Sequence, residues 1–235
     1  MTVATALSAS AYDFCVDGIY YTKLSNTEVA VDPGDEKYTG VVNIPSNITV
    51  DGNTYAVTLI TSGSDGEGAF SFCTELTSVT IPNTVTEIGA GSFSHCSALS
   101  SVNIPNSVTK IGGSSFYGCS TLSSINIPNS VTIIDYFAFC DCKGLTTIDI
   151  PNSVKTFGWG VFSRCENLTS VTLSDAIDKI ERSMFSGCKK LNSITIPNGV
   201  TTIGGSAFSS SGLTSIVIPN SVKALKDQPL IGAKV

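Results

Sequence analysis

One pattern of residues recurs along this chain at a fixed interval of 23 positions, and this interval restricts the fold more than any other feature. Six copies contain a phenylalanine, a cysteine three residues later, a leucine three residues after that, and two further aliphatic residues, and a seventh copy has Ser211 in place of the cysteine. The phenylalanines are Phe70, Phe93, Phe116, Phe139, Phe162, Phe185 and Phe208. Repeats of this length are typical of leucine-rich solenoids, in which stacked coils bury one continuous core.

Each copy of the pattern can be read as one coil. Residues 122–127 alternate apolar and polar side chains toward their end, which predicts a short strand with one buried face. Pro128 follows and ends the strand, because proline cannot donate a ladder hydrogen bond. Phe116 and Cys119 are three positions apart and are expected on one side of a helical turn. Glycines such as Gly112 are expected to permit a bend. We therefore expect parallel strands on one face and short helical turns or loops on the other.

The two ends of the chain depart from the repeat. The first residues are apolar and contain Ala-Ser-Ala at positions 9–11, which fits either a signal-peptide remnant without its positive leader or a frayed terminus. An Asp51-Gly52 pair between alternating residues predicts a β-hairpin. The expected divisions are a signal-peptide remnant at 1–11, an N-terminal β-hairpin cap with a first partial repeat at 12–60, the solenoid at 61–230 and a tail at 231–235.

The composition argues against several classes of function. The net charge is −6, so the chain lacks the basic surface that binds nucleic acid. No apolar run reaches the ~18 residues of a membrane span, so this segment is not expected to be transmembrane. The sequence has no phosphate loop, G-x-S-x-G or H-E-x-x-H motif, and its single histidine, His95, lies in a variable slot read as solvent-facing. We expect no catalytic residue, cofactor or metal site.

The cysteines follow the repeat. Six of the eight occupy the same slot beside leucines, so we expect a ladder of buried free thiols, with disulfides between neighbouring coils as the alternative. Cys140 lies two residues before Cys142 and is expected to face outward. Cys15 lies in the cap. Both are expected to be free thiols.

The variable surface slots hold the candidate binding residues. Tyr136, Trp159 and Arg182 share one slot in successive coils, with Phe137 beside them. Tyr, Trp and Arg dominate binding hot spots, which predicts a partner-binding patch, although rings that merely cover a bend would give the same pattern. The outward slot of the strand face is polar and offers few anchors, so it is either a solvated face or a weak binding surface. Its candidate residues are Thr80, Asn103, Asn126, Asp149, Thr172 and Thr195.

Over residues 42–230 the chain resembles the BspA-like leucine-rich repeats of bacterial and protozoan surface proteins. The resemblance lies in the motif Leu-x-x-Val-x-Ile-Pro-Asn-x-Val-x-x-Ile-Gly followed by Phe-x-x-Cys. The resemblance implies a curved right-handed leucine-rich-repeat solenoid of the α/β type. It also implies a secreted or cell-surface, non-enzymatic protein that mediates adhesion by binding host matrix or cell-surface proteins. Two alternatives stay open: a structural spacer that displays another module, and carbohydrate binding through the polar strand face, with glycans as partners.

Overall fold

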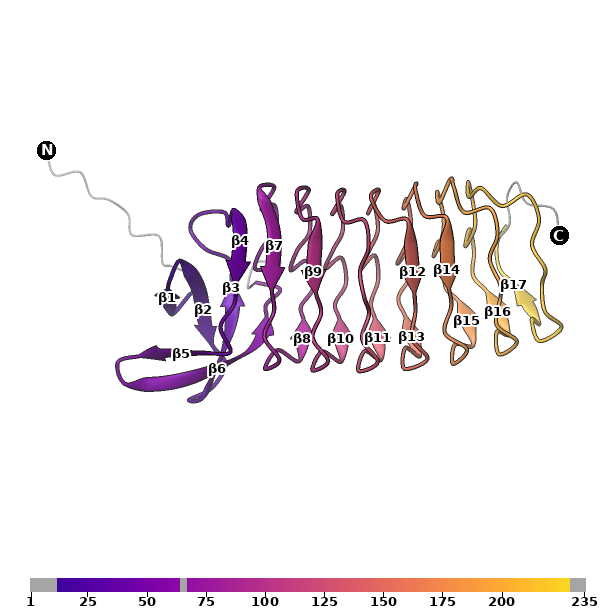
Figure 1. The fold of residues 1–235 in the computed structure, drawn as a ribbon. Helices are drawn as coiled ribbons and strands as arrows, with labels where there is room; N and C mark the ends of the chain where they lie inside the picture. The colour runs from indigo at the N-terminus through magenta and orange to yellow at the C-terminus, as the bar shows by residue number, and fades with distance from the viewer. Residues whose placement is uncertain (1–11, 64–66, 229–235) are drawn as a thin grey trace, which may run out of the picture.

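The computed structural model describes residues 12–63 and 67–228, which form a row of stacked coils behind an N-terminal cap (Figure 1). Parallel strands connect successive coils, and the predicted leucine-rich-repeat solenoid is confirmed. The interpretations of residues 1–11 and 231–235 lie outside the described residues. Of the two alternatives for the side opposite the strands, the described residues show loops, and none of them is helical.

The cap is built from antiparallel strands that lead into the first coil. The predicted hairpin is confirmed: β5 pairs antiparallel with β6 around Asp51 and Gly52, which have the positive φ angles, 50° and 77°, of a tight hairpin turn. Strand β3 pairs antiparallel with β2 and parallel with β6, so the cap and the solenoid share one sheet. The cap strands are β1 (Phe14–Val16), β2 (Ile19–Lys23), β3 (Glu28–Asp32), β5 (Asn47–Val50) and β6 (Asn53–Ile60).

The predicted strand face is present but discontinuous. It begins with three parallel strands and continues with a separate pair, while residues 122–127 and 191–196 follow the same path without forming a regular strand. The triple is β4 (Gly40–Asn43), β7 (Leu76–Thr80) and β9 (Ser101–Asn103), and the pair is β12 (Thr147–Asp149) and β14 (Ser170–Thr172).

A second row of parallel strands, which the sequence did not predict, runs along the side where the chain was expected only to turn (Figure 1). Each strand has only two residues, too few to show a period of two, and every strand except the last ends on a buried apolar residue. The row consists of β8 (Glu87–Ile88), β10 (Lys110–Ile111), β11 (Ile133–Ile134), β13 (Thr156–Phe157), β15 (Lys179–Ile180), β16 (Thr202–Ile203) and β17 (Ala224–Leu225).

From Phe93 onward, the loop around each phenylalanine of the column has a left-handed residue two positions before the phenylalanine and another two positions after it. In the coil of Phe93, the flanking Gly91 and His95 have φ of 66° and 59°. This geometry turns alternate N–H groups toward the next coil: the N–H of Phe93 donates to Ser115 O at 2.7 Å, and that of His95 to Tyr117 O at 2.6 Å. The same two positions are left-handed at Ser114 and Gly118, Phe137 and Asp141, Gly160 and Arg164, Ser183 and Gly187, and Ser206 and Ser210.

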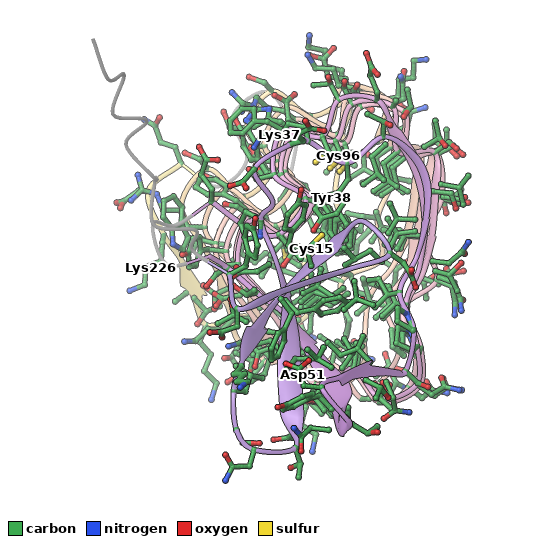
Figure 2. The ribbon with its side chains drawn as sticks, turned by 90° about the vertical axis from the view of Figure 1, so that its left-hand side faces the viewer. Cys15, Lys37, Tyr38, Asp51, Cys96 and Lys226 are labelled. Carbon is green, nitrogen blue, oxygen red and sulfur yellow. The ribbon has the colours of Figure 1, made fainter. Side chains whose placement is uncertain are left out.

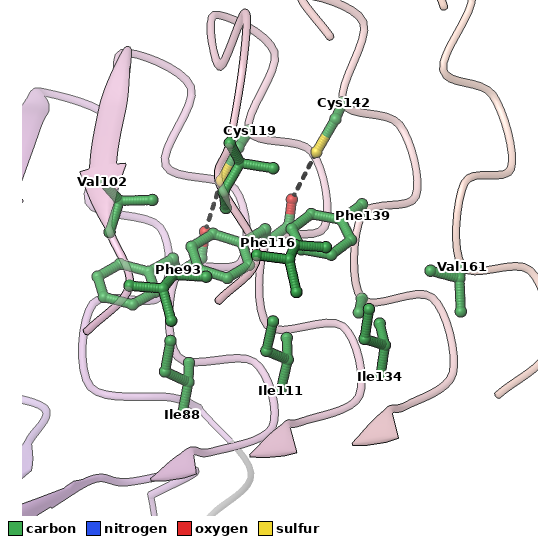
Figure 3. Packing of buried hydrophobic residues seen from close by; sticks show 14 of the residues in the cluster. Ile88, Phe93, Val102, Ile111, Phe116, Cys119, Ile134, Phe139, Cys142 and Val161 are labelled. Atoms are coloured by element: carbon green, nitrogen blue, oxygen red, sulfur yellow. Dashed lines mark hydrogen bonds between the residues drawn. The ribbon is translucent and has the colours of Figure 1, made fainter. Parts of the chain in front are cut away.

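The core is a column of stacked phenylalanines beside a column of thiols (Figure 3). The ring centroid of Phe116 lies 5.2 Å from that of Phe93 and 5.3 Å from that of Phe139, and the three rings are nearly parallel. From Cys96 onward, each thiol of the column donates to a phenylalanine carbonyl of the preceding coil, as Cys142 Sγ does to Phe116 O at 3.1 Å. All eight cysteines are free, and the six of the repeat slot are buried as predicted.

The expectation that Cys140 faces outward is wrong, because its side chain is only 2% exposed. The prediction placed Cys140 and Cys142 on a helical turn, in which residues two positions apart do not share a face. The intervening Asp141 has φ of 62°, so the chain curls between the two sulfurs. The guanidinium of Arg164 in the next coil then covers Cys140, with its Nη2 3.9 Å from the sulfur.

The repeat-slot glycines have a different role from the predicted bend. Their φ angles are not left-handed, but neighbouring coils approach them closely. A Cβ on Gly158 would lie 2.0 Å from the backbone nitrogen of Tyr136, and one on Gly112 would lie 2.6 Å from that of Ala90. Glycine therefore lets the coils stack closely at this slot.

Candidate functional site

Three aromatic side chains form the aromatic flank, which is defined here as the exposed Tyr136 and Trp159 together with the half-buried Phe137. The rings of Tyr136 and Trp159 are offset-stacked with centroids 6.4 Å apart, and Phe137 tilts against Trp159 at 4.3 Å. Tyr136 is 42% exposed and Trp159 is 49% exposed. Large aromatic surfaces left in solvent mark interaction sites when they are grouped, and here three rings touch.

Small residues beneath the aromatic flank hold its rings in place. The ring of Tyr136 lies over Gly113, where a Cβ would come within 2.6 Å of the ring, and Phe137 covers Gly160 in the same way. Asp135 Oδ1 accepts a hydrogen bond from the backbone N–H of Tyr136 at 2.7 Å. The flank is thus a packed, pre-arranged surface, and binding to it immobilises fewer side chains than binding to a loose one.

Arg182 is the fourth residue predicted for this patch, and its side chain lies apart from the rings. Its carbonyl accepts the N–H of Gly160 at 2.8 Å, so its coil is next to that of Trp159. Its exposed side chain lines a hollow of about 490 Å³ together with Glu181 and Lys226. The described residues show no contact between the guanidinium and the Trp159 ring.

A groove of about 230 Å³ adjoins the aromatic flank on the side of the earlier coils. Tyr136 forms part of its wall, and Glu87, Lys110 and Asp135 place charges in it. Lys110 Nζ lies 2.7 Å from Glu87 Oε1, and this hydrogen bond raises the pKa of Lys110 although partial burial opposes it. The groove combines an aromatic wall with charges of both signs, an arrangement that can hold a polar ligand group.

A second surface cluster was missed by sequence reasoning. We call it the aromatic–cationic ridge, made of Phe72, His95, Tyr117, Asp141 and Arg164. His95 is half-buried, stacked on Phe72 at 4.7 Å and edge-on to Tyr117 at 5.0 Å. The guanidinium of Arg164 lies 5.8 Å from the Tyr117 ring, hydrogen-bonds its hydroxyl, and pairs with Asp141 at 3.3 Å. The variability of this slot was taken only as a sign of exposure, whereas its aromatic and arginine content was the signal that could have revealed the cluster.

The six strand-face candidates are all exposed and are spaced one per coil along one side of the solenoid. Thr80 Oγ1 donates to Asn43 Oδ1 of the preceding coil at 2.8 Å, which continues the polar row into the cap. The structure therefore places this row on the strand face, away from the loops that carry the aromatic flank. Its other members are Asn103, Asn126, Asp149, Thr172 and Thr195.

Two kinds of feature are absent from the part of the chain that the structure describes. Within residues 12–63 and 67–228, no three side chains of His, Cys, Asp or Glu come together as metal ligands would. The same part of the chain holds no helix with the length and apolarity of a membrane span.

Comparison with known proteins places the chain among repeat proteins. The model of the BspA type leucine rich repeat region matches in six copies, over residues 63–172 and 114–230. A leucine-rich repeat protein from Bacteroides ovatus is 36% identical with a TM-score of 0.78, over 92% of this chain but only 61% of the other, less than two thirds of its length. The leucine-rich repeat protein of T. pallidum is 27% identical with a TM-score of 0.70, over 82% of this chain and 86% of that one.

A search of curated proteins returned no match. The repeat model alone accounts for more than half of the chain, and the Bacteroides ovatus protein adds an identity above 30% over nearly all of it. The chain belongs to the BspA-type leucine-rich repeat family.

Proposed function

We propose that this protein is a secreted or cell-surface, non-enzymatic binding protein that adheres to partner proteins through the aromatic flank. The observation that carries the proposal is the contact of Tyr136 with Trp159, two exposed rings held on a glycine-supported surface. Tryptophan and tyrosine anchors of this kind supply much of the binding energy of protein interfaces. Family membership supports the surface location, because the resemblance to BspA-like proteins implies export.

The surroundings of the flank support a protein partner. The charged groove of Glu87, Lys110 and Asp135 lies on one side of it, so an apolar centre has polar groups at its margin. Protein interfaces share this arrangement of an apolar core with a polar rim. Matrix and host-cell surface proteins are the partner class that the family resemblance implies.

Direct binding measurements test this proposal. The full chain would be passed over immobilised matrix proteins and cell-surface ectodomains, and each positive pair measured again with Trp159→Ala and Tyr136→Ala. We expect a loss of affinity of about tenfold or more for either variant. Lys190→Ala, an exposed change outside the aromatic flank, the groove and the strand-face row, is the control and should leave affinity unchanged. Equal binding by the native chain and Trp159→Ala would refute the assignment of the flank.

Glycan binding is a second candidate, favoured by the groove beside Tyr136. An aromatic wall next to Glu87, Lys110 and Asp135 offers both a stacking face and hydrogen-bonding groups to a sugar. A glycan array probed with the native chain and with Asp135→Asn separates the two candidates. Signals that the native chain gives and Asp135→Asn loses support glycan recognition, and an array without signal removes this candidate.

A further inference from the structure

The N-terminal end of the solenoid contains a cavity that the aromatic flank does not touch. Its volume is about 400 Å³, within the range of ligand sites in proteins. Strand β4 lines it on one side, the turn between β1 and β2 lines it on another, and Tyr21 and Tyr38 contribute to its surface. Figure 2 looks onto this end of the molecule and shows Tyr38 in its interior.

Strand β4 is the edge strand of its sheet, since β7 is its only partner among the described strands. The N–H groups of Gly40 and Ile44 donate to carbonyls of the next coil at 2.9 and 3.1 Å. Successive residues of a strand direct their backbone groups to opposite sides. The N–H and C=O groups of Val41 and Asn43 therefore face away from β7, and both residues line the cavity.

One of the residues that line the cavity, Tyr21, carries a buried hydroxyl without a partner among the described residues. Tyr21 is fully buried, and its hydroxyl has no hydrogen-bond partner among the residues that the structure describes. Tyr38, in contrast, accepts the N–H of Tyr20 at 3.0 Å and donates to Asp32 O at 2.9 Å. Burial, with the nearby charge of Asp17, raises the pKa of Tyr21, so the hydroxyl remains a donor. An unpaired buried hydroxyl is unfavourable, and a ligand carbonyl in the cavity would satisfy it.

We propose that this cavity binds an extended peptide segment of a partner protein as an added strand alongside β4. Strand addition uses the free backbone groups of an edge strand for affinity and nearby pockets for side-chain selection. Val41 and Asn43 present these groups about 6.6–6.8 Å apart, the repeat of two extended residues. The hydroxyl of Tyr21 donates to a peptide carbonyl, and the carboxylate of Asp17 on the cavity wall selects a Lys or Arg in the peptide. This inference does not rest on the aromatic flank.

Selection from a phage library of random linear peptides, about seven residues long, tests the proposal on the full chain. Val41→Pro removes the outward N–H while leaving the bonds to β7, and Val41→Thr keeps both the N–H and the side-chain shape. Peptides enriched on the native chain should lose about tenfold or more in affinity for Val41→Pro and stay within about twofold for Val41→Thr. Asp17→Asn should remove the enrichment of Lys and Arg. No enrichment, or equal binding to Val41→Pro, would overturn the proposal.

Tyr21→Phe provides a second test, which does not depend on strand geometry. Because the hydroxyl is unpaired in the free protein, its removal should leave the melting temperature unchanged or higher and weaken the selected synthetic peptide about fivefold to tenfold. A lower melting temperature with unchanged peptide affinity would show that the hydroxyl is structural and would contradict the proposal.

Amide hydrogen exchange identifies the occupant of the edge. The amides of Val41 and Asn43 should exchange fast in the free chain and slowly with the selected peptide. If they are already slow and become fast on deletion of residues 1–11, the chain covers its own edge. If they slow with rising protein concentration, a second copy covers it. Either result would refute a partner peptide as the occupant.

Discussion

The thiol of Cys119 donates a hydrogen bond to the carbonyl oxygen of Phe93, 3.1 Å away in the preceding coil. This carbonyl oxygen also accepts a hydrogen bond from the N–H of Cys96 at 3.2 Å, so the thiol of Cys119 bonds to the second lone pair of the oxygen. The same contact recurs at Cys96, Cys142, Cys165 and Cys188. Cysteine suits this repeat position because its side chain is small and apolar, so it packs in the core, and because its S–H also donates to a buried carbonyl.

Stability should fall as the pH rises above about 8.5, the ordinary pKa of a thiol. Burial raises the pKa of Cys188 to about 12, so the folded chain keeps a proton that the unfolded chain loses. The unfolded state then binds fewer protons, and the free energy of unfolding decreases by up to about 1.4 kcal/mol per pH unit for each such thiol. Urea unfolding under reducing conditions at pH 7, 8.5 and 9.5 measures this. Cys188→Ala should show a shallower decline, and an identical decline would contradict the assignment.

Thiol accessibility should single out Cys15. It is the exposed cysteine, while the remaining seven, Cys140 included, are buried. A thiol-specific chromogenic reagent should therefore label one site rapidly in the native chain and all eight in denaturant. Cys15→Ser should remove the rapid phase. Rapid labelling of Cys140 would mean that Arg164 does not cover it.

Truncation in the middle of the phenylalanine column should be strongly destabilising. Phe116→Ala removes a fully buried ring that contacts rings on both sides, and we expect a loss of about 3–5 kcal/mol in the free energy of unfolding. Phe116→Leu keeps most of the volume and should cost clearly less. Chemical denaturation compares them, and equal losses would argue against cavity formation as the cause.

Replacement by alanine should lower the stability of the chain by different amounts at Gly158 and at Gly40. At Gly158 the new Cβ would lie 2.0 Å from the nitrogen of Tyr136, so neighbouring coils must separate, at a cost of about 3 kcal/mol. At Gly40 the space is open and only the φ of 64° is unfavourable for alanine, which costs about 1 kcal/mol. Melting temperatures of Gly158→Ala and Gly40→Ala give the order, and the reverse order would refute close approach as the reason for Gly158.

Phe137→Ser should loosen the aromatic flank without harming the fold. Ser114 and Ser183 occupy the same left-handed position in other coils, so the backbone accepts serine there. The substitution removes the ring that lies 4.3 Å from Trp159. Because Trp159 is the single tryptophan, its fluorescence emission should shift to longer wavelength while the melting temperature changes little. An unshifted emission would show that Phe137 does not cover Trp159.

The core could be predicted from the sequence because equal spacing gives equal environments. Once Phe116 is placed inward, the register of a stacked repeat places the other phenylalanines, the slot cysteines and the leucines with it. The backbone of the loops could not be predicted in this way. Its left-handed positions hold residues as different as Gly91, Phe137 and Arg164, so no residue type marked them.

The surface clusters were predictable only where neighbours share a slot. Tyr136 and Trp159 occupy the same repeat position in successive coils, which predicted that they are neighbours, and the structure shows their rings in contact. The contacts of the aromatic–cationic ridge depend on how far its side chains extend, and the repeat spacing does not predict this. The side chain of Arg164 reaches past one coil to Tyr117, which lies 47 residues earlier in the chain. In the coil of Tyr117, the repeat position equivalent to Arg164 is Gly118, which has no side chain in the way.

The hydrogen bonds of the left-handed loops all run in one direction, since the N–H groups of Phe93 and His95 donate to the following coil and none of their ladder bonds points back. Their peptide dipoles therefore add along the axis of the stack, as they do in a helix. The array has its carbonyl pole toward the cap, where the ammonium of Lys37 lies 3.0 Å from Ser71 O. This row of loops is thus electrically polarised, and a coil can join it in only one orientation.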